Sequence, residues 1–95
     1  MDKNNYKKDI LDKLCYTELV YSRINKKLNI VLSKDKIEEL ILNIINETDE
    51  TQFKKNGKNI YVTNKERQIM LTINSYTNRI ITADKINRKT TTANS

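Results

Sequence analysis

The sequence contains no histidine, no proline and no tryptophan, and it has one cysteine, Cys15, and one glycine, Gly57. Without histidine the chain lacks the commonest general base and the commonest metal ligand. One cysteine and no histidine exclude both a standard zinc site and an intramolecular disulfide. A single glycine excludes the glycine-rich loops that hold phosphate groups. We therefore expect no cofactor, no metal and no classical catalytic motif.

The scarcity of glycine also shapes the expected turns and the expected role of Cys15. Turn positions with positive φ fall mostly to asparagine, which tolerates the left-handed region better than other side chains. Cys15 lies within an apolar helical stripe, where a cysteine packs as a small hydrophobic side chain. The alternative for Cys15 is a reactive thiol.

The length and composition indicate one small globular domain. The chain has 95 residues and 37% of them are hydrophobic, which suffices for a core when the residues are patterned. No apolar run approaches the roughly 20 residues of a membrane span, and no signal peptide is recognisable. We expect a cytoplasmic protein without a membrane partner, with a domain over residues 1–86 and a flexible tail over residues 87–95.

Positive charge is concentrated in the second half of the chain. Residues 1–50 hold nine Lys and Arg against ten Asp and Glu, a net charge of −1. Residues 51–95 hold nine Lys and Arg against only Glu66 and Asp84, a net charge of +7, and the two halves sum to +6. Such an asymmetry favours a polyanion or an acidic protein surface as the partner.

The first half predicts two amphipathic helices. Apolar residues recur at three- and four-residue spacing from Tyr6 to Leu28, which predicts one long helix. A second stripe predicts a helix from Lys34 to Asn46, with Ser33 or Asp35 as its N-cap. Each helix has one apolar face, so each needs a partner surface.

The second half predicts an antiparallel sheet of short strands. Strands are expected over residues 51–55, 59–63, 68–74 and 79–85, with a hairpin turn at Asn56-Gly57. The alternation predicts that one face meets the helices through Phe53, Ile60, Val62, Ile69, Leu71, Ile73 and either Ile80 or Ile81. The fold class is therefore α+β, with two N-terminal helices on one face of a three- to four-stranded meander.

Basic residues with aromatic neighbours are the main candidates for a binding site. Lysine and arginine neutralise phosphates, and tyrosine rings stack on unpaired bases. The alternative is a solvated sheet in which lysines block edge pairing. The candidate residues for nucleic-acid or partner binding are Lys54, Lys55, Lys58, Tyr61, Lys65, Arg67, Tyr76, Arg79 and Lys85.

Two smaller groups are weaker candidates. Tyr16, Glu18, Tyr21 and Arg23 could line a pocket where the first helix crosses the sheet, but the favoured interpretation is that the two tyrosines border the core. The acidic run 47–50 is expected to be a solvated helix end and not a cation site, because it lacks the glycine that calcium loops use.

Three stretches carry a resemblance to a known family. The runs at residues 15–24, 57–64 and 72–84 resemble a small bacterial family catalogued only as a domain of unknown function. This resemblance implies no activity. The order of elements is also similar to that of RelE- and colicin-like ribonuclease toxins, which implies that Lys58, Arg67 and Arg79 would stabilise a phosphate while Tyr61 or Tyr76 orients a base.

Three functions follow as hypotheses. The first is a non-enzymatic module that engages nucleic acid or a nucleic-acid-handling protein, such as a regulator or inhibitor encoded by a phage or mobile element. The second is a metal-independent ribonuclease toxin. The third is a homodimeric protein-interaction module that pairs through an open sheet edge.

Overall fold

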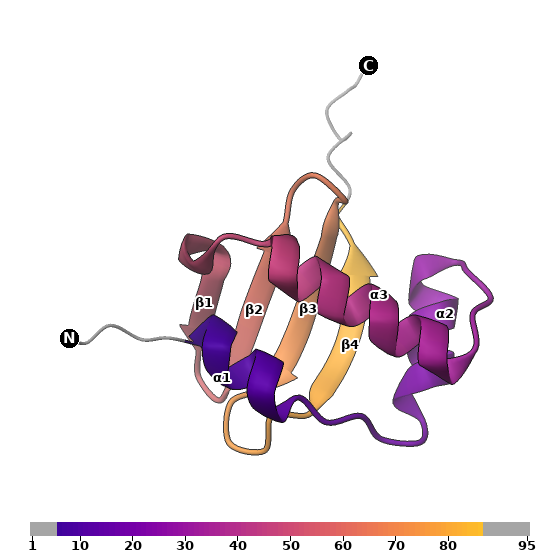
Figure 1. Cartoon of the computed structure of the whole chain (residues 1–95), viewed down its shortest axis with the longest axis horizontal. Helices are drawn as coiled ribbons and strands as arrows, with labels where there is room; N and C mark the ends of the chain where they lie inside the picture. The colour runs from indigo at the N-terminus through magenta and orange to yellow at the C-terminus, as the bar shows by residue number, and fades with distance from the viewer. Residues whose placement is uncertain (1–5, 87–95) are drawn as a thin grey trace.

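A computed structural model describes residues 6–86, which form three α-helices followed by a four-stranded antiparallel sheet (Figure 1). The strands follow one another in the order β1-β2-β3-β4, as a meander. The α+β class is therefore confirmed, and the predicted tail lies outside the described residues. The elements are α1 (Tyr6–Lys13), α2 (Val20–Leu28), α3 (Lys34–Glu47), the 3-10 turn η1 (Glu50–Gln52), β1 (Phe53–Asn56), β2 (Asn59–Asn64), β3 (Ile69–Asn74) and β4 (Ile80–Lys85).

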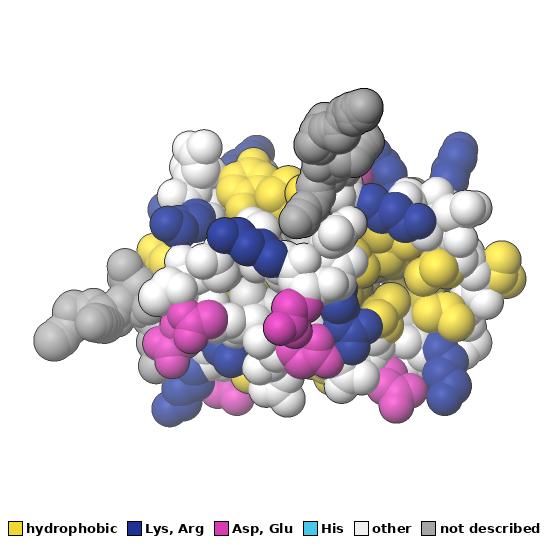
Figure 2. All heavy atoms as spheres, turned by 90° about the horizontal axis from the view of Figure 1, so that it is seen from above, with side chains coloured by type: hydrophobic (Ala, Val, Ile, Leu, Met, Phe, Trp, Pro, Cys, Tyr) yellow, Lys and Arg dark blue, Asp and Glu magenta, His cyan; other side chains and the backbone are white. Residues whose placement is uncertain are grey.

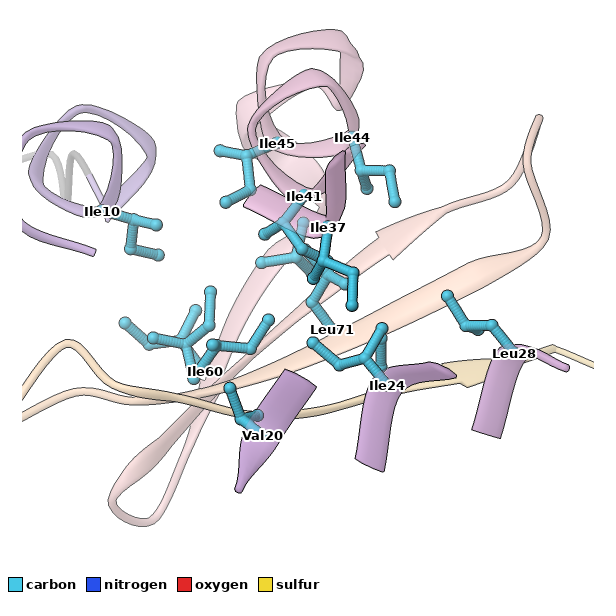
Figure 3. Close-up of a cluster of buried hydrophobic side chains, with 14 of the residues drawn as sticks. Ile10, Val20, Ile24, Leu28, Ile37, Ile41, Ile44, Ile45, Ile60 and Leu71 are labelled. Carbon is cyan, nitrogen blue, oxygen red and sulfur yellow. The ribbon is translucent and has the colours of Figure 1, made fainter. Parts of the chain in front are cut away.

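The core lies between α3 and one face of the sheet. Helix α3 begins where predicted, since the Ser33 hydroxyl accepts a hydrogen bond from the Lys36 amide (3.3 Å). Its four buried isoleucines sit at helical spacing and point toward the sheet, as Figure 3 shows. The strand residues that pack against these isoleucines are those that the alternation predicted, apart from Ile69, which is half-buried at the border of the core. The fully enclosed strand residues are Phe53, Ile60, Val62, Leu71, Ile73, Ile80 and Ala83.

The predicted long first helix is wrong, because the chain leaves the helix after Lys13 and resumes it only at Val20. Between the two helices the backbone runs beside the start of β4. The Cys15 amide donates to the Asn78 carbonyl (2.8 Å), and the Ile80 amide donates to the Cys15 carbonyl (3.0 Å). These bonds satisfy groups at the β4 edge that would otherwise stay unpaired. Helix α2 then lies beside β4 (Figure 1).

The expected burial of Cys15 is also wrong, since its side chain is exposed. The break in the helix turns the residue out of the apolar stripe. We predict that a thiol reagent such as DTNB labels Cys15 fully within minutes in the native protein, without denaturant. Labelling that requires unfolding would contradict the extended segment at Cys15. The Cys15→Ser variant has no thiol and serves as the unlabelled control, and it should keep the melting temperature of the parent.

The tight turns are formed by different residues from those expected. In the first hairpin Asn56 pairs with Asn59, so the turn residues are Gly57 and Lys58 and not Asn56-Gly57. Gly57 has φ +66, as a hairpin turn with glycine at its first central position requires. Elsewhere positive φ occurs at Asn29 and Asn78, as expected of asparagine, and also at Gln68.

The two edges of the sheet differ. The β4 edge is covered by Cys15 and α2, whereas β1 has a hydrogen-bonded neighbour on one side only among residues 6–86. Strand β1 is four residues long and carries Lys54 and Lys55, both exposed. A homodimer formed through this edge would bring the lysines of both copies together, so like charge opposes that pairing.

None of the helices in the described chain is long and apolar enough to cross a membrane.

A buried polar network joins the end of α3 to the turn after β2. The Asn64 amide nitrogen donates to the Thr48 hydroxyl (3.0 Å) and to the Ile44 carbonyl (3.4 Å). The Thr48 hydroxyl in turn donates to the Ile44 carbonyl (2.6 Å), and the Asn64 side-chain oxygen accepts from the Arg67 amide (2.8 Å). Asn64 and Thr48 are both buried, so these bonds replace water that the core excludes.

Candidate nucleic-acid interface

The structure divides the nine candidate residues among four places and does not form one basic face. Lys54 and Tyr61 lie on the sheet face away from the core, and Arg79 lies at the start of β4. The remaining six fall at opposite ends of the sheet. Lys55, Lys58 and Tyr76 lie at the end that carries the β1–β2 and β3–β4 turns, which we call the hairpin end. Lys65, Arg67 and Lys85 lie at the end of the β2–β3 turn, which we call the opposite end.

The two turns of the hairpin end are tied together by hydrogen bonds. The Ser75 amide donates to the Lys58 carbonyl (2.8 Å), and the Ser75 hydroxyl donates to the same oxygen (2.9 Å). The tie joins residues that lie 17 positions apart in the sequence. It therefore fixes the backbone that carries Lys58 against the turn that carries Tyr76.

The turn before β4 presents Tyr76 outward. The Asn74 side-chain oxygen accepts hydrogen bonds from the Tyr76 amide (2.8 Å) and the Thr77 amide (3.0 Å), a turn geometry that asparagine favours. Asn78 closes the turn with φ +59, and its amide donates to the Asn74 carbonyl (2.8 Å). The Tyr76 side chain is 76% exposed. The turn is thus ordered by local bonds while its aromatic ring faces solvent.

A hollow of about 310 Å³ lies at the hairpin end, between α1 and the sheet. Two tyrosines from distant parts of the chain line it, together with Lys55 and Asp9. Ile60 and Ile10 supply apolar surface, and two polar side chains of the β3–β4 turn complete the lining. The lining residues are Tyr6, Asp9, Ile10, Lys55, Ile60, Ser75, Tyr76 and Asn78.

This hollow combines the features that an unpaired nucleotide needs. Aromatic rings stack on bases, a lysine attracts the phosphate, and a carboxylate accepts hydrogen bonds from exocyclic amino groups. Among residues 6–86, Lys55, Lys58 and Lys54 form no ion pair with a carboxylate. Within this part of the chain, no carboxylate competes with a polyanion for their charge.

The opposite end of the sheet is electrostatically mixed. Arg67 donates two hydrogen bonds to Glu47, from Nε to Oε1 and from Nη2 to Oε2 (2.8 Å each). This bidentate pair with Arg67 lowers the pKa of Glu47 and raises that of Arg67. Figure 2 looks onto this end and shows acidic side chains interspersed with basic ones. A polyanion gains little attraction there.

Two further hollows open at the opposite end. One of about 320 Å³ is lined by Thr63, Lys65, Gln68 and Ile86, so a lysine is its single charged group in the described chain. The other, of about 160 Å³, is lined partly by Glu47, Asp49 and Glu66. Neither pairs an aromatic ring with a cation, which distinguishes them from the hollow at the hairpin end.

The acidic run 47–50 behaves as a solvated helix end. Glu47 is engaged by Arg67, and the Asp49 carboxylate accepts hydrogen bonds from the amide (3.0 Å) and the hydroxyl of Thr51. Hydrogen bonding by the Thr51 side chain and amide lowers the pKa of Asp49. Within the part of the chain that the structure describes, no three or more acidic, cysteine or histidine side chains group as metal ligands.

The residues suggested by the ribonuclease toxins do not come together. Lys58 and Arg67 flank β2 at its two ends, and a six-residue strand spans roughly 20 Å. Arg79 lies at the start of β4 beside Cys15, and Arg67 is occupied by Glu47. A single phosphate cannot contact all three side chains in this arrangement.

Tyr61 and Lys54 lie on the sheet face away from the core. The register places them side by side, in a row that continues through Thr72 and Thr82. Tyr61 is half-buried in this row, and its hydroxyl accepts a hydrogen bond from the Asn59 amide group (3.4 Å). The ring thus packs across strands, while Lys54 stays exposed.

The second group of candidates forms a tyrosine pair on the helical side. Tyr16 and Tyr21 stack with ring centroids 5.6 Å apart, and the Tyr21 hydroxyl donates to Glu38 (2.6 Å). Lys34 pairs with Glu18 (2.5 Å) and lies over the Tyr21 ring. Burial is the main cause that raises the pKa of Tyr16. Both tyrosines are partly buried against the core, which confirms the favoured interpretation of this group.

The bond from Tyr21 to Glu38 predicts a pH dependence. This hydrogen bond is the main cause that raises the pKa of Tyr21 from 10.0 to about 12. Because the folded pKa is the higher one, the bond contributes stability below pH 10 that is lost as the pH rises towards 12. Stopped-flow pH jumps followed at 295 nm should show a phenol with a midpoint near 12 that Tyr21→Phe removes. If Tyr21→Phe instead removed a phenol that titrates with a midpoint near 10, the hydrogen bond to Glu38 would be contradicted.

Comparison with known proteins identifies the family. Residues 8–84 match the family described as Protein of unknown function (DUF3781). The chain belongs to this family. The match runs from α1 to β4 and confirms the resemblance to a family without an assigned activity. No curated protein and no solved structure matches the chain significantly.

In this DUF3781 protein, sequence reasoning found part of the hairpin end and missed the rest. It identified Lys55, Lys58 and Tyr76. It missed Tyr6 and Asp9, because no local spacing indicates that α1 folds against the end of the sheet. The exposed aromatic ring in a turn was the available signal, and the partners from α1 required the tertiary structure.

Proposed function

We propose that this DUF3781 protein binds single-stranded nucleic acid at the hairpin end of its sheet. The observation that carries the proposal is the hollow of about 310 Å³ that joins Tyr6, Tyr76 and Lys55. Lys58 is held beside it by the Ser75 hydrogen bonds. Stacking and phosphate neutralisation are the two interactions that sequence-tolerant single-strand binding uses.

The size and lining of the hollow favour a single strand over a duplex. Its volume lies at the lower limit of ligand pockets, which suits one nucleotide unit. A base reaches a tyrosine ring by its flat face only when it is unstacked. An acidic protein surface would satisfy the lysines but would leave the exposed Tyr76 ring without a role.

Binding without catalysis is the activity that the site supports. Among residues 6–86, Asp9 is the one carboxylate that lines the hollow, and within that part of the chain no second carboxylate stands opposite it. General acid–base catalysis needs such a positioned partner. We propose a binding module, of the kind that a phage or mobile element uses as a regulator or inhibitor.

A fluorescence anisotropy titration tests this function. The probes are fluorescein-labelled 12-nucleotide strands of oligo(dT) and oligo(U), with a 12-base-pair duplex for comparison. Lys55→Gln/Lys58→Gln is compared with the matched pair Lys65→Gln/Lys85→Gln, whose lysines are exposed at the opposite end. Two lost phosphate contacts should weaken single-strand binding about 25-fold at 0.1 M salt and reduce the salt slope by about 1.4.

The control pair should change the affinity less than twofold. An equal loss in both double variants would show general charge attraction and not a site at the hairpin end. Absence of binding to both single strands at low salt would refute the proposed function.

A further inference from the structure

A separate hollow of about 240 Å³ lies where the start of α2 meets the start of β4. It is lined by aliphatic side chains and by two arginines, and no aromatic ring among the described residues contributes to it. Tyr16 and Tyr21, which flank this segment in the sequence, stack on each other and are not among the lining residues. The lining residues are Thr17, Leu19, Val20, Arg23, Arg79, Ile80 and Ile81.

Two of its aliphatic side chains are exposed to solvent. Leu19 precedes α2 and is 76% exposed. Ile81 is 39% exposed because a bulge leaves it without a partner: Thr72 pairs with Thr82, while Ile73 pairs with Ile80. Bulges redirect side chains and are frequent next to functional sites.

The two arginines have no carboxylate partner within the described part of the chain. Arg23 and Arg79 form no ion pair with any carboxylate of residues 6–86, whereas Glu18, on the same connecting segment as Leu19, is engaged by Lys34. A guanidinium group binds carboxylates through paired hydrogen bonds. The hollow therefore offers two positive groups beside aliphatic surface.

We propose that this hollow binds an acidic segment of a partner protein that carries aliphatic side chains. Aliphatic side chains of the segment pack on Leu19 and Ile81, while its carboxylates pair with Arg23 and Arg79. The hollow is smaller than typical pockets for small organic ligands, and it suits a few side chains of a peptide. Without aromatic rings it lacks the stacking surface that characterises the hairpin end.

The segment docks through its side chains and does not add a strand to the sheet. The edge of β4 is already occupied here, because Cys15 pairs with Asn78 and Ile80 through its backbone. Strand addition would require those bonds to break. The two hollows share no lining residue, although Asn78 of the first directly precedes Arg79 of the second, so the test below measures both binding activities.

The test is a titration of the ¹⁵N-labelled full chain with a hexapeptide of alternating Glu and Leu, followed by NMR. We expect the largest amide shifts at Thr17–Arg23 and Arg79–Ile81. Leu19→Ser and Arg79→Gln should each weaken binding roughly fivefold or more, because they remove apolar contact and a charge-assisted hydrogen bond respectively. Replacing Glu by Gln in the peptide should abolish measurable binding.

Matched controls exist on the same helix and its following loop. Val31→Ser removes an aliphatic side chain that is 96% exposed, and Lys26→Gln removes an exposed charge of α2. Both should leave peptide affinity unchanged, and circular dichroism should show that all variants are folded.

Three results would overturn the proposal. The first is no binding of the Glu-Leu peptide, and the second is equal loss in the control variants. The third is weakening of oligo(dT) binding by Leu19→Ser and Arg79→Gln as strong as that of Lys55→Gln/Lys58→Gln, which would make the hollow part of the nucleic-acid interface.

Discussion

Replacement of Asn64 by leucine is expected to lower the melting temperature by about 10–20 °C. The side chain is buried and makes three hydrogen bonds, to Thr48, to Ile44 and to Arg67. Leucine fills similar space but removes the acceptor of the Arg67 amide and the donor to the Thr48 hydroxyl, while the Thr48 bond to the Ile44 carbonyl remains, at a cost of about 2–3 kcal/mol. For a domain of this size each kcal/mol shifts the melting temperature by about 4–8 °C. Thermal unfolding followed by circular dichroism measures the shift.

Two further variants isolate the cause of this loss. Asn43→Leu makes the same chemical change at an exposed position of α3 and should shift stability by less than about 0.5 kcal/mol. Asn64→Asp keeps the acceptor for the Arg67 amide but loses the donor to Thr48, and its buried carboxylate should destabilise the fold further as the pH rises. An Asn64→Leu protein as stable as the parent would refute the network.

Replacement of Tyr76 by alanine is expected to weaken single-strand binding about 10- to 100-fold without affecting the fold. The ring is exposed, so its removal breaks no core contact. Base–aromatic stacking contributes about 1–3 kcal/mol per base. The loss should be the same at low and high salt, since no phosphate contact is removed. Anisotropy titrations at two salt concentrations measure it.

Phenylalanine at position 76 provides the control, because it keeps the stacking face and loses only the hydroxyl. We expect Tyr76→Phe to bind within about twofold of the parent. Should Tyr76→Ala bind as tightly as Tyr76→Phe, the ring would have no role in recognition, and the lysines alone would account for binding.

Alternation predicted the strands of the sheet well. Ile69, Leu71 and Ile73 alternate with polar or flexible residues, and the structure places Leu71 and Ile73 in the core. At Ile80 and Ile81 the pattern left two choices, because consecutive isoleucines satisfy either face. The bulge against β3 decides between them, and bulges depend on the register of two strands, which a single segment does not encode.

The break between α1 and α2 could not be predicted from periodicity. Residues 14–19 continue the apolar spacing, so the helical pattern runs through them. The break is decided by the β4 edge, because Asn78 and Ile80, more than 60 positions later, bond to the backbone of Cys15. Such long-range pairing overrides local helical preference.

The same limit explains why one basic surface was expected and several places were found. The lysines and arginines of the second half are dense in sequence, but successive turns of a meander lie at alternate ends of the sheet. Charges in neighbouring turns therefore separate, as Lys58 and Arg67 do. The hydrogen bonds of Ser75 bring the first and third turns back together.

Chemical-shift mapping with unlabelled oligo(dT) tests the central claim most directly. In the ¹⁵N-labelled full chain, saturating oligonucleotide should shift the amides of residues 55–58 and 75–78 most strongly, together with those of α1 that line the hollow. Residues 65–68 and Lys85 should change little. Shifts centred on the opposite end, or spread evenly over all lysines, would contradict a single-strand site at the hairpin end.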